Sequence, residues 1–187
     1  MKNFLILFLL FAFSTTTKAQ LTSTNPDTVC YHSSGSIYQV TNNTGDTYTW
    51  TIASPGVITS GQGTNSITVD WSNAAPGLII TGVSVYATNS AGCQSPPVNL
   101  NVFVLNIIPT ISPINLCVNA GCVTLSGTPA GGIWSGIGVS GNQFCPSVAG
   151  VGNASLTYTY SLAGCTFTST GIAVVNPLPT ITPITHD

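Results

Sequence analysis

Short segments in which apolar and polar residues alternate run along most of the chain. They lie at 48–52, 66–71, 83–86, 98–104 and 155–160. Alternation with a period of two sends successive side chains to opposite faces of a strand, so each segment predicts a half-buried β-strand. Gly, Pro and Asn interrupt the pattern about every ten residues, as in turns. The pattern therefore predicts an all-β fold of the β-sandwich type, with no substantial helix.

The first residues follow a different pattern. Lys2 precedes an unbroken apolar run over 4–13, and small residues then place Thr17 and Ala19 at the −3 and −1 positions of a cut before Gln20. This order predicts a secretory signal peptide at 1–19, because the apolar run is shorter than the roughly 20 residues of a membrane helix. The residue directly after the cut is not a cysteine, and no later segment is long and apolar enough to span a bilayer. We expect a mature chain that is soluble after cleavage and secreted or held at the cell surface.

Charge is scarce along the rest of the chain. The only basic residues, Lys2 and Lys18, belong to the predicted signal peptide, and four aspartates are the only acids. Binding of nucleic acid or of an anionic membrane needs cationic side chains, so the mature chain is not expected to bind either. Because 43% of the residues are hydrophobic, the chain is expected to fold rather than to be disordered.

Two similar proline-containing segments divide the chain. Ile107-Ile-Pro-Thr-Ile-Ser-Pro-Ile114 recurs as Pro177-Leu-Pro-Thr-Ile-Thr-Pro-Ile184. Two prolines in each copy argue against regular strand pairing and for stiff linkers. We predict a first sandwich at 20–107, a second at 108–178, and a linker stub at 179–187 that introduces a further repeat of a longer array. The alternative for the last segment is a simple C-terminal tail.

Six cysteines in an exported chain predict three disulfides. In the first half, Cys30 and Cys93 flank Trp50 in the order of an immunoglobulin-like sandwich, where a bridge joins the two sheets and an indole packs on it. We therefore predict a Cys30–Cys93 bridge, with Trp50 in the core.

The second half holds four cysteines, and their pairing rests on analogy. Cys165 follows a glycine, as Cys93 does, which pairs Cys165 with Cys117 and leaves Cys122 for Cys145. Four cysteines allow other connectivities, and these remain open. A four-thiolate zinc site is the competing interpretation, but such sites are built from closely spaced cysteine pairs, which this half lacks.

Few residues are candidates for catalysis or for cofactor binding. Gly136-Ile-Gly-Val-Ser-Gly141 matches a dinucleotide-binding fingerprint, but the residues after it do not start a helix, so a β-turn is the better interpretation. The aspartates are scattered, and His32 has no evident acid or base partner. We predict no catalytic residue, no cofactor, no metal and no enzymatic activity.

Four aromatic residues suggest one binding hypothesis. Trp71, Trp134, Tyr158 and Tyr160 fit an exposed platform on which sugars stack. The alternative, which we favour, is that each of them fills a core or covers a sheet face, since aromatic side chains mostly serve as buried area.

Longer motifs resemble known modules. Tyr48-Thr-Trp-Thr-Ile52 and Asn89-Ser-Ala-Gly-Cys93 resemble the PKD-like modules of bacterial surface proteins, and the glycine-rich stretch 125–141 is similar to the Ig-like repeats beside them in adhesins of gliding bacteria. The resemblance implies tandem β-sandwiches in secreted or cell-surface proteins, often exported by the type IX route, without catalytic residues. The C-terminal sorting domain usual in such proteins is absent from this sequence.

The function expected from these observations is structural and adhesive. The chain is expected to be a non-catalytic extracellular repeat protein whose partner is an extracellular polymer, a glycan or a neighbouring surface protein. The alternative is a carbohydrate-binding accessory module of a secreted protein.

Overall fold

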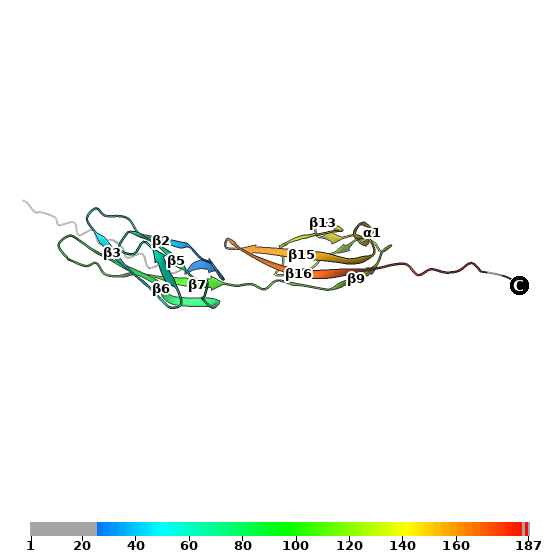
Figure 1. Cartoon of the computed structure of the whole chain (residues 1–187), viewed down its shortest axis with the longest axis horizontal. Coiled ribbons are helices and arrows are strands. Elements are labelled where there is room, and N and C mark those ends of the chain that lie inside the picture. The colour runs from blue at the N-terminus through cyan, green and yellow to red at the C-terminus, as the bar shows by residue number, and fades with distance from the viewer. Residues whose placement is uncertain (1–25, 185, 187) are drawn as a thin grey trace, which may run out of the picture.

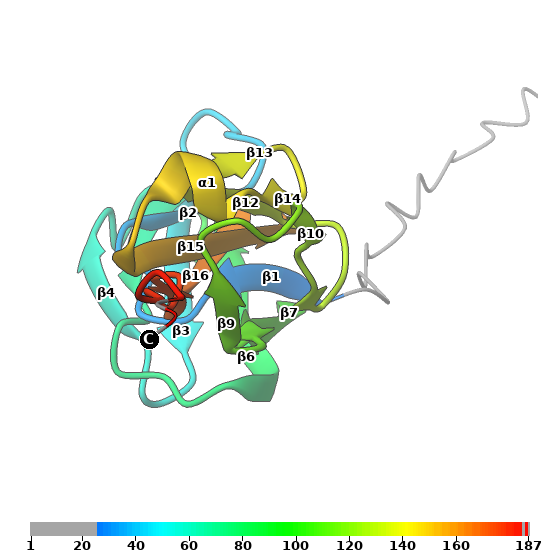
Figure 2. The ribbon, with the colours of Figure 1, turned by 90° about the vertical axis from the view of Figure 1, so that its right-hand side faces the viewer.

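A computed structural model describes residues 26–184 and 186, and the predicted signal peptide lies outside them. The fold is all-β, as predicted. Two β-sandwiches follow each other along the chain and lie end to end, which makes the molecule elongated (Figure 1). Viewed along the long axis, the second sandwich lies in front of the first (Figure 2). The molecule is therefore a two-segment rod.

The first sandwich packs a four-stranded sheet against a three-stranded sheet. The strand orders are β1-β7-β6-β3 and β2-β5-β4, and all pairs are antiparallel except β1 with β7, which is parallel. The strands are β1 (Asp27–Cys30), β2 (Ser36–Gln39), β3 (Thr47–Ile52), β4 (Val57–Ser60), β5 (Ser66–Asp70), β6 (Gly77–Thr88) and β7 (Val98–Leu105).

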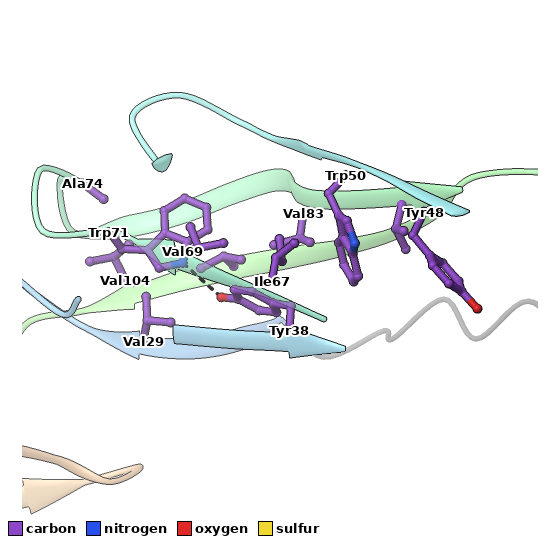
Figure 3. Close-up of a cluster of buried hydrophobic side chains, with 12 residues drawn as sticks. Val29, Tyr38, Tyr48, Trp50, Ile67, Val69, Trp71, Ala74, Val83 and Val104 are labelled. Atoms are coloured by element: carbon purple, nitrogen blue, oxygen red, sulfur yellow. Dashed lines mark hydrogen bonds between the residues drawn. The ribbon is translucent and has the colours of Figure 1, made fainter. Parts of the chain in front are cut away.

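The core of the first sandwich gathers the inward side chains of both sheets (Figure 3). Its centre is made of Trp71 and Val69 from one layer and Val102 and Val104 from the other, all with 0% exposure. Trp50 is also buried, as predicted, and its indole N–H donates to the carbonyl of Thr64 at 2.8 Å. The alternation in β3 and β5 is what places these apolar side chains on the inward face.

The second sandwich repeats the plan, with shorter strands in its small sheet. A four-stranded sheet has the order β12-β15-β16-β9, and a small sheet with the order β10-β14-β13 accompanies it. The elements are β9 (Ile114–Cys117), β10 (Val123–Thr124), β12 (Ile133–Gly136), β13 (Val139–Ser140), β14 (Gln143–Phe144), the single-turn helix α1 (Pro146–Ala149), β15 (Gly152–Leu162) and β16 (Cys165–Asn176).

Tyr158 organises the core of the second sandwich. Its ring packs on Trp134 with 4.7 Å between the ring centroids. Its hydroxyl donates to the carbonyl of Pro129 and accepts the backbone N–H of Gly132 at 2.8 Å. The tyrosine thereby fixes the loop that precedes β12.

The first proline-containing segment is not free of strand pairing, contrary to the expectation from its prolines. Within it, β8 (Thr110–Ile111) pairs with β11 (Gly127–Thr128), and Ile111 packs against the core of the second sandwich. Pairing is possible because the ladder is only two residues long and fits between Pro109 and Pro113. The segment is thus attached to the second sandwich.

Candidate functional site at the junction of the two sandwiches

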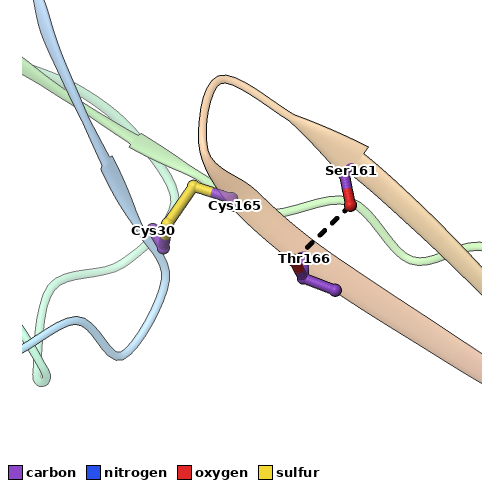
Figure 4. The surroundings of a disulfide bond; sticks show 4 residues. All are labelled: Cys30, Ser161, Cys165 and Thr166. Atoms are coloured by element: carbon purple, nitrogen blue, oxygen red, sulfur yellow. Dashed lines mark hydrogen bonds between the residues drawn. A yellow bond between two sulfur atoms is a disulfide. The ribbon is translucent and has the colours of Figure 1, made fainter.

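A disulfide joins the two sandwiches. Cys30 of the first is bonded to Cys165 of the second across 135 residues of sequence, with 5.4 Å between the Cα atoms (Figure 4). This bond replaces both the predicted Cys30–Cys93 bridge and the predicted Cys117–Cys165 bridge. Cys93 and Cys117 are free and exposed.

The strand register explains why the predicted bridges do not form. Cys30 lies opposite Leu105 at the end of β7, whereas Cys93 precedes the start of β7. The seven steps along this strand place the two cysteines more than about 20 Å apart at about 3.3 Å per residue. Cys117 and Cys165 lie at opposite ends of β16, because Cys117 is opposite Asn176. A disulfide needs Cα atoms within about 7 Å, so neither pair can close.

Two local structures bring the bonded cysteines together. Cys30 is the last residue of β1, and the next residue, Tyr31, donates its N–H to the carbonyl of Leu105 at 2.9 Å, which fixes this end of the strand. Cys165 follows the tight turn between β15 and β16, where Ala163 and Gly164 have φ values of 50° and 80°. Beside it, the hydroxyls of Ser161 and Thr166 lie 3.5 Å apart (Figure 4). The hairpin thus presents Cys165 to the end of β1.

The second disulfide is the one predicted. Cys122 and Cys145 directly extend the ladder in which Val123 of β10 lies opposite Phe144 of β14. Consecutive positions on paired antiparallel strands stay opposite each other, so the two thiols meet without distortion of the ladder. This bridge fastens the small sheet of the second sandwich.

The four aromatic residues of the sugar-stacking hypothesis do not form an exposed platform. Trp71, Trp134 and Tyr158 are 0%, 7% and 1% exposed, and they belong to two different cores. Tyr160 is half-buried and packs against the second core. The stacking assignment is therefore wrong for the three buried residues, and the alternative of core packing describes them.

Two of the candidate acid–base residues, His32 and Asp70, each contact the backbone of Ser72. His32 is on the surface, where its ring lies 3.7 Å from that of Tyr31 and its Nδ1 is 2.8 Å from the carbonyl oxygen of Ser72. The Asp70 carboxylate accepts the backbone N–H of Ser72 at 2.8 Å. This bond, and to a smaller extent a hydrogen bond from the Ser72 hydroxyl, lowers the pKa of Asp70. Among residues 26–184 and 186, no three His, Cys, Asp or Glu side chains group as they would to hold a metal ion.

The segment Gly136–Gly141, which matches the dinucleotide-binding fingerprint, forms turns, as the residues after it indicated. Gly136 ends β12, and the strands that follow, β13 and β14, form a hairpin around Gly141, whose φ is 58°. At Gly138, with a φ of 82°, a Cβ would press on Ala149 of α1. The single helical turn of α1 contains only four residues, so no helix is placed to receive a pyrophosphate.

One buried polar cluster escaped the sequence analysis. The Trp71 indole N–H donates to the Tyr38 hydroxyl at 3.1 Å in the first core, and that hydroxyl also bonds to Asp27 (Figure 3 shows the first pair). Burial, and then the charge of Asp27 and the hydrogen bond to it, hold the pKa of Tyr38 well above its usual range. The residues are far apart in sequence: the pairing of β2 with β5 brings Tyr38 to Trp71, and the packing of that sheet on the sheet of β1 brings it to Asp27.

An open depression lies over the second sandwich and is lined by Pro113, Ser155, Thr170, Gly171 and Ile172. Over residues 26–184 and 186, the structure contains no helix with the length and apolar character needed to cross a bilayer. The junction disulfide, which the fold positions between the two sandwiches, is the candidate site considered below.

Comparison with known proteins shows a family similarity for the first half of the chain. Residues 15–102, just under half of the chain, match the family model of the PKD-like domain. No curated protein matches the chain. The crystal structure of the titin domains z1z2 in complex with telethonin is similar at 16% identity and a TM-score of 0.27, over 82% of this chain and 93% of that chain. The first sandwich is therefore similar to a PKD-like domain.

Proposed function

We propose that the chain is a non-catalytic extracellular spacer that resists bending and stretching while it holds an adhesive partner at a distance. The observation that carries the proposal is the disulfide between Cys30 and Cys165. A single flexible connection lets two modules hinge, whereas a second, covalent connection at the same junction restricts that motion. The first connection here, 106–113, is itself attached to the second sandwich through β8.

The bond also changes the path along which tension travels. A pull on residues before Cys30 passes through the disulfide directly into β16 and leaves by the C-terminal segment. The chain between the two cysteines is outside that path and cannot add to the extension, while β1 and β16 carry the load. A load-bearing surface protein needs this property, and the similarity of residues 15–102 to a PKD-like domain supports a structural role.

Stiffness tests the proposal directly. Cys93 and Cys117 are exposed thiols, and they accept a pair of fluorescent dyes in the native protein. We expect a narrow distribution of dye-to-dye distances in the native protein and a broad one in the Cys30→Ser/Cys165→Ser variant. The Cys122→Ser/Cys145→Ser variant is the matched control and should keep the narrow distribution. Equal widths in the native protein and the junction variant would refute a stiffening role.

Export is tested separately. The chain expressed in a bacterium with its natural N-terminus should lose residues 1–19 and arrive outside the cytoplasm with Cys30 and Cys165 oxidised. An uncut chain with reduced thiols in the cytoplasm would contradict an extracellular spacer. In the same preparation a glycan array should retain nothing, whereas a retained sugar would favour the carbohydrate-binding alternative.

A further inference from the structure

The two free cysteines occupy the same places in their sandwiches as the two bonded ones. Cys30 ends β1, the strand parallel to β7, and Cys117 ends β9, the strand parallel to β16. In both strands the residue before the cysteine faces the core and the cysteine faces outward. Each cysteine therefore marks the end of its sandwich at which the last strand leaves.

The backbone around these two cysteines makes the same hydrogen bonds. Tyr31 N–H donates to Leu105 at 2.9 Å, and Val118 N–H donates to Asn176 at 2.9 Å. The carbonyl of Cys30 accepts the N–H of Ser33 at 2.9 Å, and that of Cys117 accepts the N–H of Ala120 at 3.0 Å. The end of the second sandwich thus reproduces the local frame that holds Cys30 in the junction disulfide.

The other two cysteines correspond in the same way. Cys93 follows Gly92 in the loop between β6 and β7, and Cys165 follows Gly164 in the turn between β15 and β16. The glycines have φ values of 81° and 80°, a region that favours glycine and turns the chain back immediately before each cysteine. Both loops lie at the end of the sandwich where its last strand begins. Cys93 thus occupies the place from which Cys165 reaches Cys30.

We propose that Cys117 of one molecule and Cys93 of a second copy of this chain form a head-to-tail disulfide that repeats the Cys30–Cys165 junction. Cys93 precedes the start of β7, whose other end carries the junction, and Cys117 lies opposite Asn176 at the end of β16 away from Cys165. The two thiols are therefore at opposite ends of the molecule, which cannot close on itself. A second copy of this chain is the partner because it carries both a Cys93 for the free Cys117 and a Cys117 for the free Cys93. A head-to-tail contact generates an open filament when its rotation does not close into a ring, and joining elongated molecules end to end favours the filament.

The bond requires an oxidant, and a disulfide such as oxidised glutathione supplies it. The Cys117 thiolate attacks one sulfur of that disulfide and releases one glutathione thiolate. The Cys93 thiolate of the second copy then attacks the protein sulfur of the mixed disulfide and releases the other. Two protein thiols are oxidised and one glutathione disulfide is reduced to two thiols. This step extends the proposed spacer function from one rod to a chain of rods.

Pairing between copies is tested in a glutathione buffer with the native Cys30–Cys165 bond intact. The native chain should give a ladder of oligomers on non-reducing gels, and the Cys93→Ser and Cys117→Ser variants should each remain monomeric. When the two variants are mixed, with one carrying a heavy isotope, only a dimer of one heavy and one light chain should form. Chymotryptic peptides should identify the Cys93–Cys117 bond, since the chain lacks basic residues after Lys18.

The ratio of mixed to symmetric dimers shows whether the two copies dock before the disulfide forms. Docking before bond formation should favour the mixed dimer over both symmetric dimers by about tenfold or more. Symmetric dimers in comparable amounts would overturn the proposal, because they indicate random thiol collision. A mixture that stays monomeric, with each thiol capped by glutathione, would also overturn it. Neither outcome affects the spacer role, which depends on Cys30 and Cys165.

Discussion

The hydroxyl of Tyr38 lies between a buried indole and a carboxylate, and this position sets how the first core responds to alkali. Its pKa is raised by burial and by Asp27. Unfolded tyrosine loses its proton near about pH 10, whereas the folded protein keeps it. Above that pH the unfolded state binds fewer protons than the native state, so the free energy of unfolding falls as pH rises, until the folded pKa is passed.

The Tyr38→Phe variant separates this effect from packing. At pH 7 it should lose about 1–3 kcal/mol, because the Trp71 N–H is left buried without its acceptor. Between about pH 9 and 12 its stability should decline less steeply than that of the native protein, since the group with the raised pKa is gone. Urea unfolding at stepped pH measures both effects, and parallel declines would show that Tyr38 is not held protonated.

Gly132 illustrates a position where packing excludes even one methyl group. A Cβ there would lie 2.5 Å from Cζ of Tyr158 and 2.6 Å from the carbonyl oxygen of Thr159. We expect Gly132→Ala to destabilise the second sandwich by about 1–3 kcal/mol through overpacking. At Gly121 a Cβ meets nothing within 4 Å, so Gly121→Ala is the matched control and should be neutral or slightly stabilising. Equal losses in thermal unfolding would contradict this account.

At the level of strands, the Cys122–Cys145 bridge fastens a sheet too small to hold itself. Strands β10, β13 and β14 contribute two residues each. The bridge joins residues 23 apart in sequence. A loop of that length, closed in the unfolded chain, raises the free energy of unfolding by about 3 kcal/mol. The Cys122→Ser/Cys145→Ser variant should lose about that much stability. The NMR signal of the Trp134 indole N–H monitors the unfolding of the second sandwich. The Cys93→Ser/Cys117→Ser variant removes two exposed thiols and should show no loss.

Alternation along the sequence was sufficient to locate most long strands. The segments 48–52, 83–86, 98–104 and 155–160 lie in β3, β6, β7 and β15, and 66–71 covers β5 and the residue after it. Alternation is a local property, since each strand must turn one face to a core regardless of its partner. The burial of Trp50 is also as predicted, although that prediction rested on an immunoglobulin-like bridge that does not form.

Disulfide partners depend on strand direction, which local pattern does not encode. The analogy with an immunoglobulin-like bridge assumed that Cys30 and Cys93 face each other across one core. The parallel pairing of β1 with β7 instead carries Cys30 to the end of the sandwich from which β7 leaves. The Gly-Cys sequence repeated at Cys93 and Cys165 was visible, but it marks an end of each module rather than an internal bridge. The Cys122–Cys145 bridge was reached by elimination after Cys117 was paired with Cys165, so it is correct although the pairing on which it rested is wrong.

For the whole molecule, the shortage of charge predicts indifference to salt. After Lys18 the sequence has no Lys, Arg or Glu and only four Asp. Raising ionic strength from 0.01 to 0.15 M shortens the Debye length from about 30 to about 8 Å, but few charge pairs exist to be screened. The melting temperature should therefore move by less than about 1 °C, corresponding to a few tenths of a kcal/mol. A shift of many degrees in sodium chloride would contradict this expectation.

Under tension the molecule should extend far less than its length of chain allows. The junction disulfide removes the 135-residue separation between Cys30 and Cys165 from the load path, and within it the Cys122–Cys145 bridge conceals 23 residues. In single-molecule stretching, the Cys30→Ser/Cys165→Ser variant should gain about 400 Å of extension over the native protein, at about 3.5 Å per freed residue. Reduction of the native protein should release the second bridge as well and extend it further. A native protein that extends as far as the variant before reduction would show that the junction bond does not carry the load.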